Sequence, residues 1–372
     1  MSESSELGRV KIVKIENKKI RNRYPRLYGK NARLAEHGYG HDIGIVTMET
    51  NCGTVGWGMG HCSNEKKELF IGKELGELFD PAIGVLSEAA YDIDLALHDL
   101  AGKVVGKPIF QMINGSLGIS GNCVNCYDGA IYMNDISPDV SRRDVNAVIE
   151  DCRYDYDVLG FRDFKVKIGR GNKWMAYEEG LAQDIKVIRA IRKEFPNCGI
   201  MVDANDGYNL ETTIKFMDAV SDCDISWLEE PFVENVDDFY KLREYLSAKS
   251  PKTLIADGES HWNVDLLIEL SQKGIIDVLL MDVHGFGFTK WRKLMPALKD
   301  LKVLASPHCW GEKLKTHYAA HLAVAYDIVP TIEGVPDETE GVVFAGYKLG
   351  NGKLEVPNGA GFGMDLIWGE NR

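Results

Sequence analysis

The sequence predicts a closed parallel (β/α) barrel preceded by a smaller α+β domain, and three observations lead to this fold class. The chain has 372 residues, enough for a barrel of roughly 250 residues and a second domain. From Asn122 onward, short apolar stretches alternate with helical patterns. Several of those stretches end in charged residues, at the position where barrels of this kind carry their active-site groups.

The composition favours a globular protein that acts on a small molecule. Hydrophobic residues make up 45% of the chain, which is ordinary for a globular protein. The net charge of −13 disfavours nucleic acid and anionic membranes as partners. The sequence shows neither an apolar run long enough to span a bilayer nor a signal peptide, so the 8 cysteines are expected to be reduced thiols of a cytoplasmic protein.

Residues 1–121 are expected to form the α+β domain. Its strands are predicted at residues 10–15, 41–50 and 53–58, the last as a hairpin return. Residues 64–114 have a helical pattern, which is clearest from Ser87 to Lys103, where apolar residues recur at three- and four-residue steps. Residues 115–121 are predicted to link this domain to the barrel.

Residues 20–40 are predicted to form a long cationic loop between the first two strands. Its positive side chains are Arg21, Arg23, Arg26, Lys30 and Arg33. A charged loop in an acidic protein is usually a solvated surface. The functional alternative is that some of these cations, Arg21 and Arg23 among them, contact the distal end of an anionic substrate.

Eight strand candidates in residues 122–341 predict the barrel, because strands that alternate with helices form parallel sheets. They are residues 122–127, 161–169, 198–205, 225–229, 253–259, 275–282, 302–308 and 328–333. The Gly-rich tail, residues 342–366, has no helical partner and is expected to return to the first domain.

Acidic residues at the ends of the third, fourth and fifth strands predict a metal site. Asp203, Glu229 and Glu259 come from successive strands and would repel one another unless a divalent cation lay between them. Carboxylate ligation favours a hard ion such as Mg²⁺. Glu230 has the opposite parity to Glu229 and is excluded, whereas Asp257 shares the parity of Glu259 and is expected nearer the barrel floor.

Basic residues on other strands are predicted to face these acids. Lys165 and Lys167 share one face of the second strand, and buried lysines require acids opposite them. Asp282 and His308 end the sixth and seventh strands, so a pair in which the carboxylate orients the imidazole is expected. Glu333 ends the eighth strand and is available to a ligand oxygen.

The order of these signals, Lys-x-Lys, Asp-x-Asn, Glu-Glu-Pro, Gly-Glu, Asp, His, Glu, resembles the enolase superfamily. Within it, the chain resembles the mandelate racemase/muconate lactonizing group and its acid-sugar dehydratases. The resemblance covers nearly the whole chain. It implies a modified TIM barrel of the (β/α)7β type over residues 122–341, with an N-terminal α+β capping domain over residues 1–121 that residues 342–372 complete. It also implies Mg²⁺ as cofactor, a sugar acid as substrate, and a homo-oligomer.

The same resemblance implies roles for individual residues. Lys167 resembles a base on one face of the substrate, and Lys165 is expected to lower its pKa by like-charge proximity. His308, paired with Asp282, resembles the base or acid on the other face. The implied metal ligands are Asp203, Glu229 and Glu259, and the implied contacts to the substrate carboxylate and its enolate are Asn205 and Glu333.

Several alternatives stay open on the sequence alone. The implied reaction is dehydration of an aldonate or aldarate to a 2-keto-3-deoxy acid. A racemase or epimerase of a 2-hydroxy or sugar acid, a lactone cycloisomerase and a non-catalytic sugar-acid binding protein are the alternatives. His284, His261 and Trp262 follow strand ends and are either pocket residues or loop packing. Cys123 and Cys126 lack a second pair at zinc-site spacing and are expected to be structural.

Overall fold

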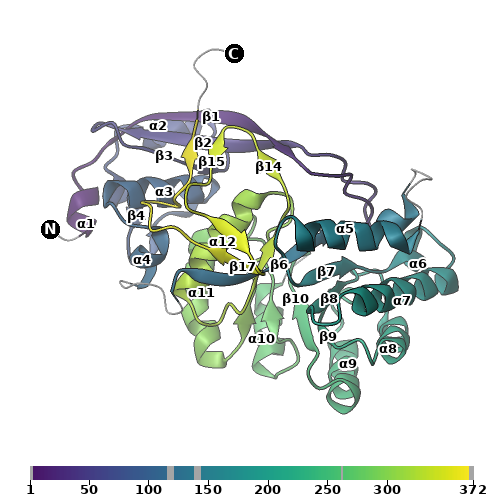
Figure 1. The fold of residues 1–372 in the computed structure, drawn as a ribbon. Helices are drawn as coiled ribbons and strands as arrows, with labels where there is room; N and C mark the ends of the chain where they lie inside the picture. Colours follow the sequence, from purple (N-terminus) through teal and green to yellow (C-terminus); the bar gives the residue numbers. More distant parts are fainter. Residues whose placement is uncertain (1–2, 115–120, 138–143, 261–262, 368–372) are drawn as a thin grey trace.

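A computed structural model describes residues 3–114, 121–137, 144–260 and 263–367, and in it a small sheet lies over one end of a barrel (Figure 1). Eight parallel strands form the barrel sheet: β6 (Cys123–Ile131), β7 (Phe164–Lys167), β8 (Ile200–Asp203), β9 (Ile225–Glu229), β10 (Leu254–Asp257), β11 (Val278–Leu279), β12 (Leu304–Ala305) and β13 (Ile332–Gly334). Strand β13 pairs with β6. Between β12 and β13, the Ala305 N–H donates to the carbonyl of Ile328, just before β13, at 3.0 Å.

Seven helices connect the strands, which gives the predicted (β/α)7β barrel. They are α5 (Val145–Asp157), α7 (Tyr177–Glu194), α8 (Leu210–Ala219), α9 (Val236–Lys249), α10 (Val264–Gln272), α11 (Phe288–Leu301) and α12 (Lys313–Ala325), with the one-turn helix α6 (Arg170–Lys173) before α7. All eight predicted strands are present. Most are shorter than predicted, because residues at one or both ends of the predicted ranges lie outside the sheet.

The cap is built on an antiparallel sheet in the order β14-β1-β2-β3. Its strands are β1 (Ile12–Arg23), β2 (Asp42–Thr50), β3 (Val55–Met59) and β14 (Glu338–Thr339). Helix α3 (Asp94–Val104) packs so closely on β3 that a Cβ atom at Gly56 would lie 2.4 Å from the Cα atom of Leu100. The absence of a side chain at this position therefore permits the contact between helix and sheet.

Two predictions for the cap were wrong in detail. The first strand was predicted to end at residue 15, but β1 continues to Arg23, so the first residues of the predicted cationic loop lie in the sheet. The extension is polar, and cross-strand partners such as Arg21 and Asp42 stabilise it. The predicted continuous helical region, residues 64–114, contains the ribbon β4 (Phe79–Asp80) and β5 (Gly84–Val85) between α2 (Asn64–Phe70) and α3. Helix α4 (Ile109–Asn114) follows α3, and the short helix α1 (Glu3–Leu7) precedes β1.

The tail contacts both the barrel and the cap. Strand β17 (Lys353–Glu355) pairs with β6 and with β16 (Lys348–Gly350), and β15 (Val342–Val343) pairs with β18 (Asp365–Leu366). The Trp57 indole then donates to the Met364 carbonyl at 3.0 Å. Strand β14 falls inside the range predicted for the barrel but pairs with β1 of the cap. The predicted domain boundaries at residues 121 and 341 stay predictions.

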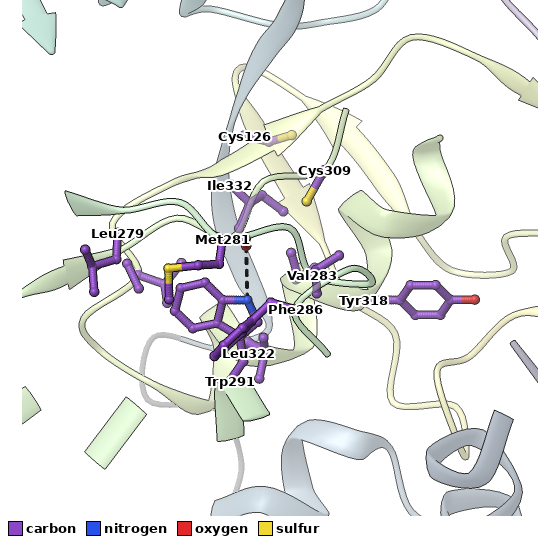
Figure 2. Close-up of a cluster of buried hydrophobic side chains, with 14 of the residues drawn as sticks. Cys126, Leu279, Met281, Val283, Phe286, Trp291, Cys309, Tyr318, Leu322 and Ile332 are labelled. Carbon is purple, nitrogen blue, oxygen red and sulfur yellow. Dashed lines mark hydrogen bonds between the residues drawn. The ribbon is translucent and has the colours of Figure 1, made fainter. Parts of the chain in front are cut away.

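A continuous apolar core joins the last barrel strands to the helices outside them (Figure 2). Trp291 on α11 is fully buried, and its indole N–H donates to the Met281 carbonyl at 3.1 Å. Tyr318 and Leu322 of α12 belong to the same cluster. This packing supports the strand ends that carry Asp282 and His308.

All 8 cysteines, including Cys123 and Cys126, are free thiols. Among the described residues, no helix is both long and apolar enough to cross a membrane.

Candidate active site

Three carboxylates converge at the carboxyl ends of neighbouring barrel strands. One oxygen atom from each of Asp203, Glu229 and Glu259 lies within 4.8 Å of the other two. The parallel register explains this arrangement, because Asp203 is the partner of Glu229 across β8 and β9 and of Lys167 across β7 and β8. The structure therefore brings together the three residues predicted to bind the metal.

The two lysines of β7 face this carboxylate cluster. The Lys165 ammonium lies 2.5 Å from Glu229 Oε1 and 2.8 Å from Glu333 Oε1, and Lys167 is ion-paired with Asp203. Both lysines are buried. Buried charges of this kind are tolerated because acids lie opposite them, as the sequence predicted.

His308 reaches the same cluster from the other side of the barrel. Its Nδ1 atom lies 3.0 Å from Asp282 Oδ2, and its Nε2 atom lies 3.2 Å from Glu259 Oε2. Asp282 and His308 form an isolated parallel bridge beyond β11 and β12, so the predicted pair is present. Glu333 on β13 lies next to it, with Oε2 3.7 Å from His308 Nε2 and 2.7 Å from the Cys309 N–H that donates to it.

The pKa of Lys167 differs from the expectation. Burial acts to lower this pKa, but Asp203 and Glu259 outweigh burial and hold it above its ordinary value. Lys165 does act in the predicted direction, to lower the pKa of its neighbour, but it is the weaker influence. The expected effect of Lys165 is therefore present, but the net pKa is raised because nearby acids dominate the local field.

The charges and donor atoms of the cluster fit a divalent cation. The carboxylates of Asp203, Glu229, Glu259 and Glu333 outnumber the basic groups that face them, which are two lysines and His308. Burial raises the pKa of Glu229 to about 8 even though Lys165 opposes this shift. The Glu259 Oε2 atom makes no hydrogen bond to any described residue. An oxygen-rich site with this charge deficit suits Mg²⁺.

Glu230, which parity excluded, and Asp257, which was expected nearer the barrel floor, both lie outside the group with metal-ligand spacing. Glu230 has a left-handed backbone with φ of 39°, and its side chain accepts a hydrogen bond of 2.6 Å from the Ser260 N–H. Asp257 is buried at the end of β10. Among the residues that the structure describes, the group with metal-ligand spacing contains neither acid.

Two residues predicted to contact the substrate lie beside the site. The Asn205 N–H donates to Asp203 Oδ1 at 2.8 Å, and the buried Asn205 Oδ1 has no hydrogen-bond partner among the described residues. His284 is exposed, and its N–H donates to Asp282 Oδ1 at 3.0 Å. Their contacts with substrate stay predictions. His261 and Trp262 lie outside the described residues.

The two cap arginines predicted to contact the substrate are engaged elsewhere. Arg21 Nη1 lies 3.1 Å from Asp42 Oδ1, and Arg23 Nε lies 2.6 Å from Glu340 Oε1. Both side chains are exposed, at 40% and 59%. A role in substrate binding stays a prediction for them, and it requires these ion pairs to open.

Sequence reasoning missed a partly buried lysine behind the histidine–aspartate pair. Lys315 on α12 places its ammonium 3.0 Å from Asp282 Oδ2 and 3.3 Å from Glu312 Oε2. Glu312 Oε1 in turn lies 2.8 Å from Nε2 of His41, at the start of the cap strand β2. No strand-end pattern marks Lys315, because it belongs to a helix.

A second missed residue was accessible to the parity argument. The Trp227 indole N–H donates to Glu229 Oε2 at 3.1 Å, since both side chains point inward from β9. Positions two apart in a strand share a face, so Trp227 was identifiable as a neighbour of the metal ligand.

Comparisons with known proteins agree with the barrel and its site. Residues 147–369 match the model of the family Enolase C-terminal domain-like. D-galactarolactone cycloisomerase of Agrobacterium fabrum is 28% identical over 361 residues, an alignment that covers 87% of this chain and 88% of the relative.

Two solved structures resemble this one over nearly its whole length. Galacturonate dehydratase from Geobacillus sp., in complex with D-galacturonate and 5-keto-4-deoxy-D-galacturonate, has a TM-score of 0.89 at 33% identity, over 96% of this chain and 95% of that chain. A mandelate racemase/muconate lactonizing protein from Geobacillus sp. Y412MC10, in complex with magnesium and tartrate, has a TM-score of 0.91 at 33% identity, over 98% and 94%.

Proposed function

Because the chain belongs to the Enolase C-terminal domain-like family, in the mandelate racemase and muconate lactonizing group of the enolase superfamily, we propose that it is a Mg²⁺-dependent acid-sugar dehydratase. The protein is an enzyme of this superfamily. It abstracts the proton α to the carboxylate of a sugar acid and eliminates the β-hydroxyl, which yields a 2-keto-3-deoxy acid.

One observation carries the proposal: two proton-transfer groups approach one carboxylate cluster from different strands. Lys167 is ion-paired with Asp203, and His308 Nε2 lies 3.2 Å from Glu259 Oε2. A substrate held at the cluster through its carboxylate therefore has Lys167 near one face and His308 near the other. Elimination of water needs one base and one acid in this arrangement.

Each residue of the site has a task in the proposed reaction. Lys167 takes the α proton in its uncharged form, and the electron pair of the broken C–H bond moves into the substrate carboxylate. Mg²⁺ held by Asp203, Glu229 and Glu259 would offset the acids that raise the pKa of Lys167, and it would stabilise the carboxylate oxygens as they gain negative charge. Lys165 adds a fixed cation beside Glu229 and Glu333. The buried setting strengthens these interactions, because little water screens them.

The second half of the reaction uses the histidine. As the enolate collapses, the β C–O bond breaks, and His308 donates its proton to the leaving oxygen, which departs as water. Asp282 accepts the hydrogen bond from Nδ1 and so leaves Nε2 facing the site. The resulting enol then tautomerises to the 2-keto acid.

The choice of substrate follows the relatives. The galacturonate dehydratase that shares 33% identity with this chain acts on a hexuronate. D-galacturonate therefore joins the aldonates and aldarates as a first substrate to test.

The alternative is α-proton exchange without loss of water. Epimerisation uses the same two groups on a substrate that lacks a suitable β-hydroxyl. The cycloisomerase relative, 28% identical to this chain, makes lactone isomerisation a second candidate of this kind.

A substrate screen distinguishes these functions. The protein with Mg²⁺ is incubated with a library of mono- and diacid sugars in deuterium oxide, and products are analysed by mass spectrometry and NMR. We expect a product lighter by one water. A product of unchanged composition with deuterium at the α carbon would indicate epimerisation or isomerisation. Ligand binding without any exchange would contradict enzymatic function.

A further inference from the structure

On the cap side of the site lie His37 and Tyr132, and neither His37 Nε2 nor the Tyr132 hydroxyl makes a hydrogen bond to a described residue. Tyr132 follows β6 directly, and its ring lies 5.6 Å from the Lys167 ammonium. Only 1% of the residue is exposed, yet its hydroxyl has no hydrogen-bond partner among the described residues. A buried unpaired hydroxyl destabilises a protein unless a ligand or water satisfies it.

His37 belongs to the cap loop and packs directly on Tyr132, with ring centroids 4.7 Å apart. Its Nδ1 atom lies 2.9 Å from the Gly29 carbonyl, which fixes the tautomer with a proton on Nδ1. Nε2 is then an acceptor. Burial lowers the pKa of His37, and the charges of Lys167 and Glu259 both affect it, which agrees with a neutral ring close to the carboxylate cluster.

An aromatic wall holds these two residues in place. Trp310 lies 4.7 Å from the Tyr132 ring and 5.4 Å from the His37 ring, measured between centroids. Tyr28 and Tyr24 extend the stack behind them. Aromatic packing of this kind fixes the positions of the Tyr132 hydroxyl and of His37 Nε2.

The loop cations that could bind a second carboxylate are already neutralised. Besides Arg21 and Arg23, three more lie in ion pairs: Arg26 with Asp155, Lys30 with Glu36 at 3.1 Å, and Arg33 with Asp206 at 2.7 Å. A diacid sugar would have to displace one of these acids. An uncharged end that carries hydroxyl groups needs no such change.

We propose that His37 and Tyr132 form the subsite for the distal end of the substrate, and that this end is uncharged and hydroxylated, so the substrate is a monoacid sugar. This inference rests on the proposed function. His37 Nε2 accepts a hydrogen bond from one substrate hydroxyl, and the Tyr132 hydroxyl pairs with another. The two residues determine specificity and do not take part in proton transfer.

The test compares substitutions that remove one polar atom at a time. His37→Asn keeps a donor near Gly29 but loses the Nε2 acceptor, whereas His37→Gln keeps a polar atom near Nε2. Tyr132→Phe removes only the hydroxyl. His61→Asn, at an exposed cap histidine, is the matched control. Kinetics are measured with a monoacid sugar and the diacid of the same configuration.

For the monoacid we expect His37→Asn and Tyr132→Phe each to raise KM about tenfold with little change in kcat, since each loses one hydrogen bond. His37→Gln should recover much of the loss, and His61→Asn should match the wild type. Wild-type enzyme should prefer the monoacid. Without ligand, Tyr132→Phe should melt no lower than the wild type, because it removes an unpaired buried hydroxyl.

Other outcomes overturn the inference without touching the proposed function. These are an unchanged KM in both variants, a preference for the diacid, or an increase in KM caused by Arg21→Gln or Arg23→Gln instead. If no sugar acid is turned over at all, the proposed function fails. Calorimetric titration of the monoacid with Mg²⁺ present then still tests the subsite, and equal affinity of wild type and Tyr132→Phe would refute it.

Discussion

Lys315 and His308 share one oxygen of Asp282: each places a nitrogen 3.0 Å from Oδ2. Burial favours the neutral form of this acid, but Lys315, followed by His308, outweighs burial and lowers the pKa of Asp282. Asp282 therefore stays charged whether or not His308 carries a proton. Its position is also fixed from two sides, which keeps the imidazole aligned with the site.

Lys315 is expected to be a positioning residue. Lys315→Met should lower kcat about tenfold or more while KM changes little, because Lys315 has no place in the proposed contacts with substrate. The melting temperature should also fall, since Asp282 and Glu312 lose a partly buried partner. Steady-state kinetics and thermal melting check this, with the exposed Lys299→Met as control. An unchanged kcat would show that His308 and Asp282 align without Lys315.

Metal dependence is expected to reside in the carboxylate cluster. Glu259→Gln removes one anionic ligand, so turnover should fall more than about 100-fold, beyond the usual loss for an outer-shell residue. The fold should be retained, because Glu259 is partly accessible and not part of the core. Activity in EDTA with and without added Mg²⁺ is measured, with Glu211→Gln, an exposed acid, as control. Full activity in EDTA would refute the ligand assignment.

Isotope exchange is expected to assign the two proton-transfer groups. If Lys167 removes the α proton, His308→Asn keeps exchange of that proton in deuterium oxide and loses dehydration, whereas Lys167→Ala loses both. NMR of recovered substrate measures the exchange. The opposite pattern would reverse the roles, as expected for a substrate of the other α configuration. Exchange in both variants would show that neither residue is the essential base.

Stability is expected to fall as the solution becomes more acidic than pH 6.5. Burial lowers the pKa of His321 to about 3, and its Nδ1 atom accepts from the Phe110 N–H at 3.3 Å. Between pH 6.5 and about pH 3, His321 binds a proton in the unfolded chain but not in the native state. Acidification therefore favours unfolding by up to about 1.4 kcal/mol per pH unit.

Urea unfolding at pH 7.5 and pH 5, in EDTA to exclude metal binding, measures this effect. His321→Gln should show a smaller loss of stability between the two pH values than the wild type. Part of the loss of stability should remain in His321→Gln, because burial also lowers the pKa of His317. Equal losses in both proteins would mean that His321 is not responsible.

The cap loop is expected to contribute more to stability than the sequence indicated. Arg26 is buried and ion-paired with Asp155 and Asp151 of α5. Arg26→Met should therefore destabilise the protein by about 3–5 kcal/mol. Arg21→Gln breaks an exposed ion pair and should cost about 1 kcal/mol or less. Urea unfolding of the two variants compares them, and equal stabilities would contradict the structural role of Arg26.

The carboxylate cluster was predictable because Asp203 and Glu229 end strands of known parity and Glu259 lies two residues after the end of β10. Asp203, Glu229 and Glu259 follow from alternation along strands and from the alignment of parallel strands at one end of the barrel. Lys315 and His37 were not predictable, because a helix turn and an irregular loop bring them to the site. Their positions depend on tertiary packing, which the periodicity of the sequence does not reveal.

The cationic loop shows the limit of arguments from charge. Five positive residues predicted a solvated loop or, as the alternative, contacts with an anionic substrate, but acidic side chains pair with all five, and most of these acids lie outside the loop. Asp155 is 129 positions from Arg26, and Glu340 is 317 positions from Arg23. The composition of a loop gives the number of its cations but does not show which acids pair with them.

The pairing of β1 with β14 has a consequence for synthesis on the ribosome. The outer edge of β1 at Asn22 and Arg23 stays unpaired until residues 338 and 339 emerge, when nearly the whole polypeptide has been made. An unpaired strand edge is a site for association with other chains. This strand edge is therefore exposed to other chains for most of translation. The abundance of polar and charged residues along β1 reduces the risk of aggregation.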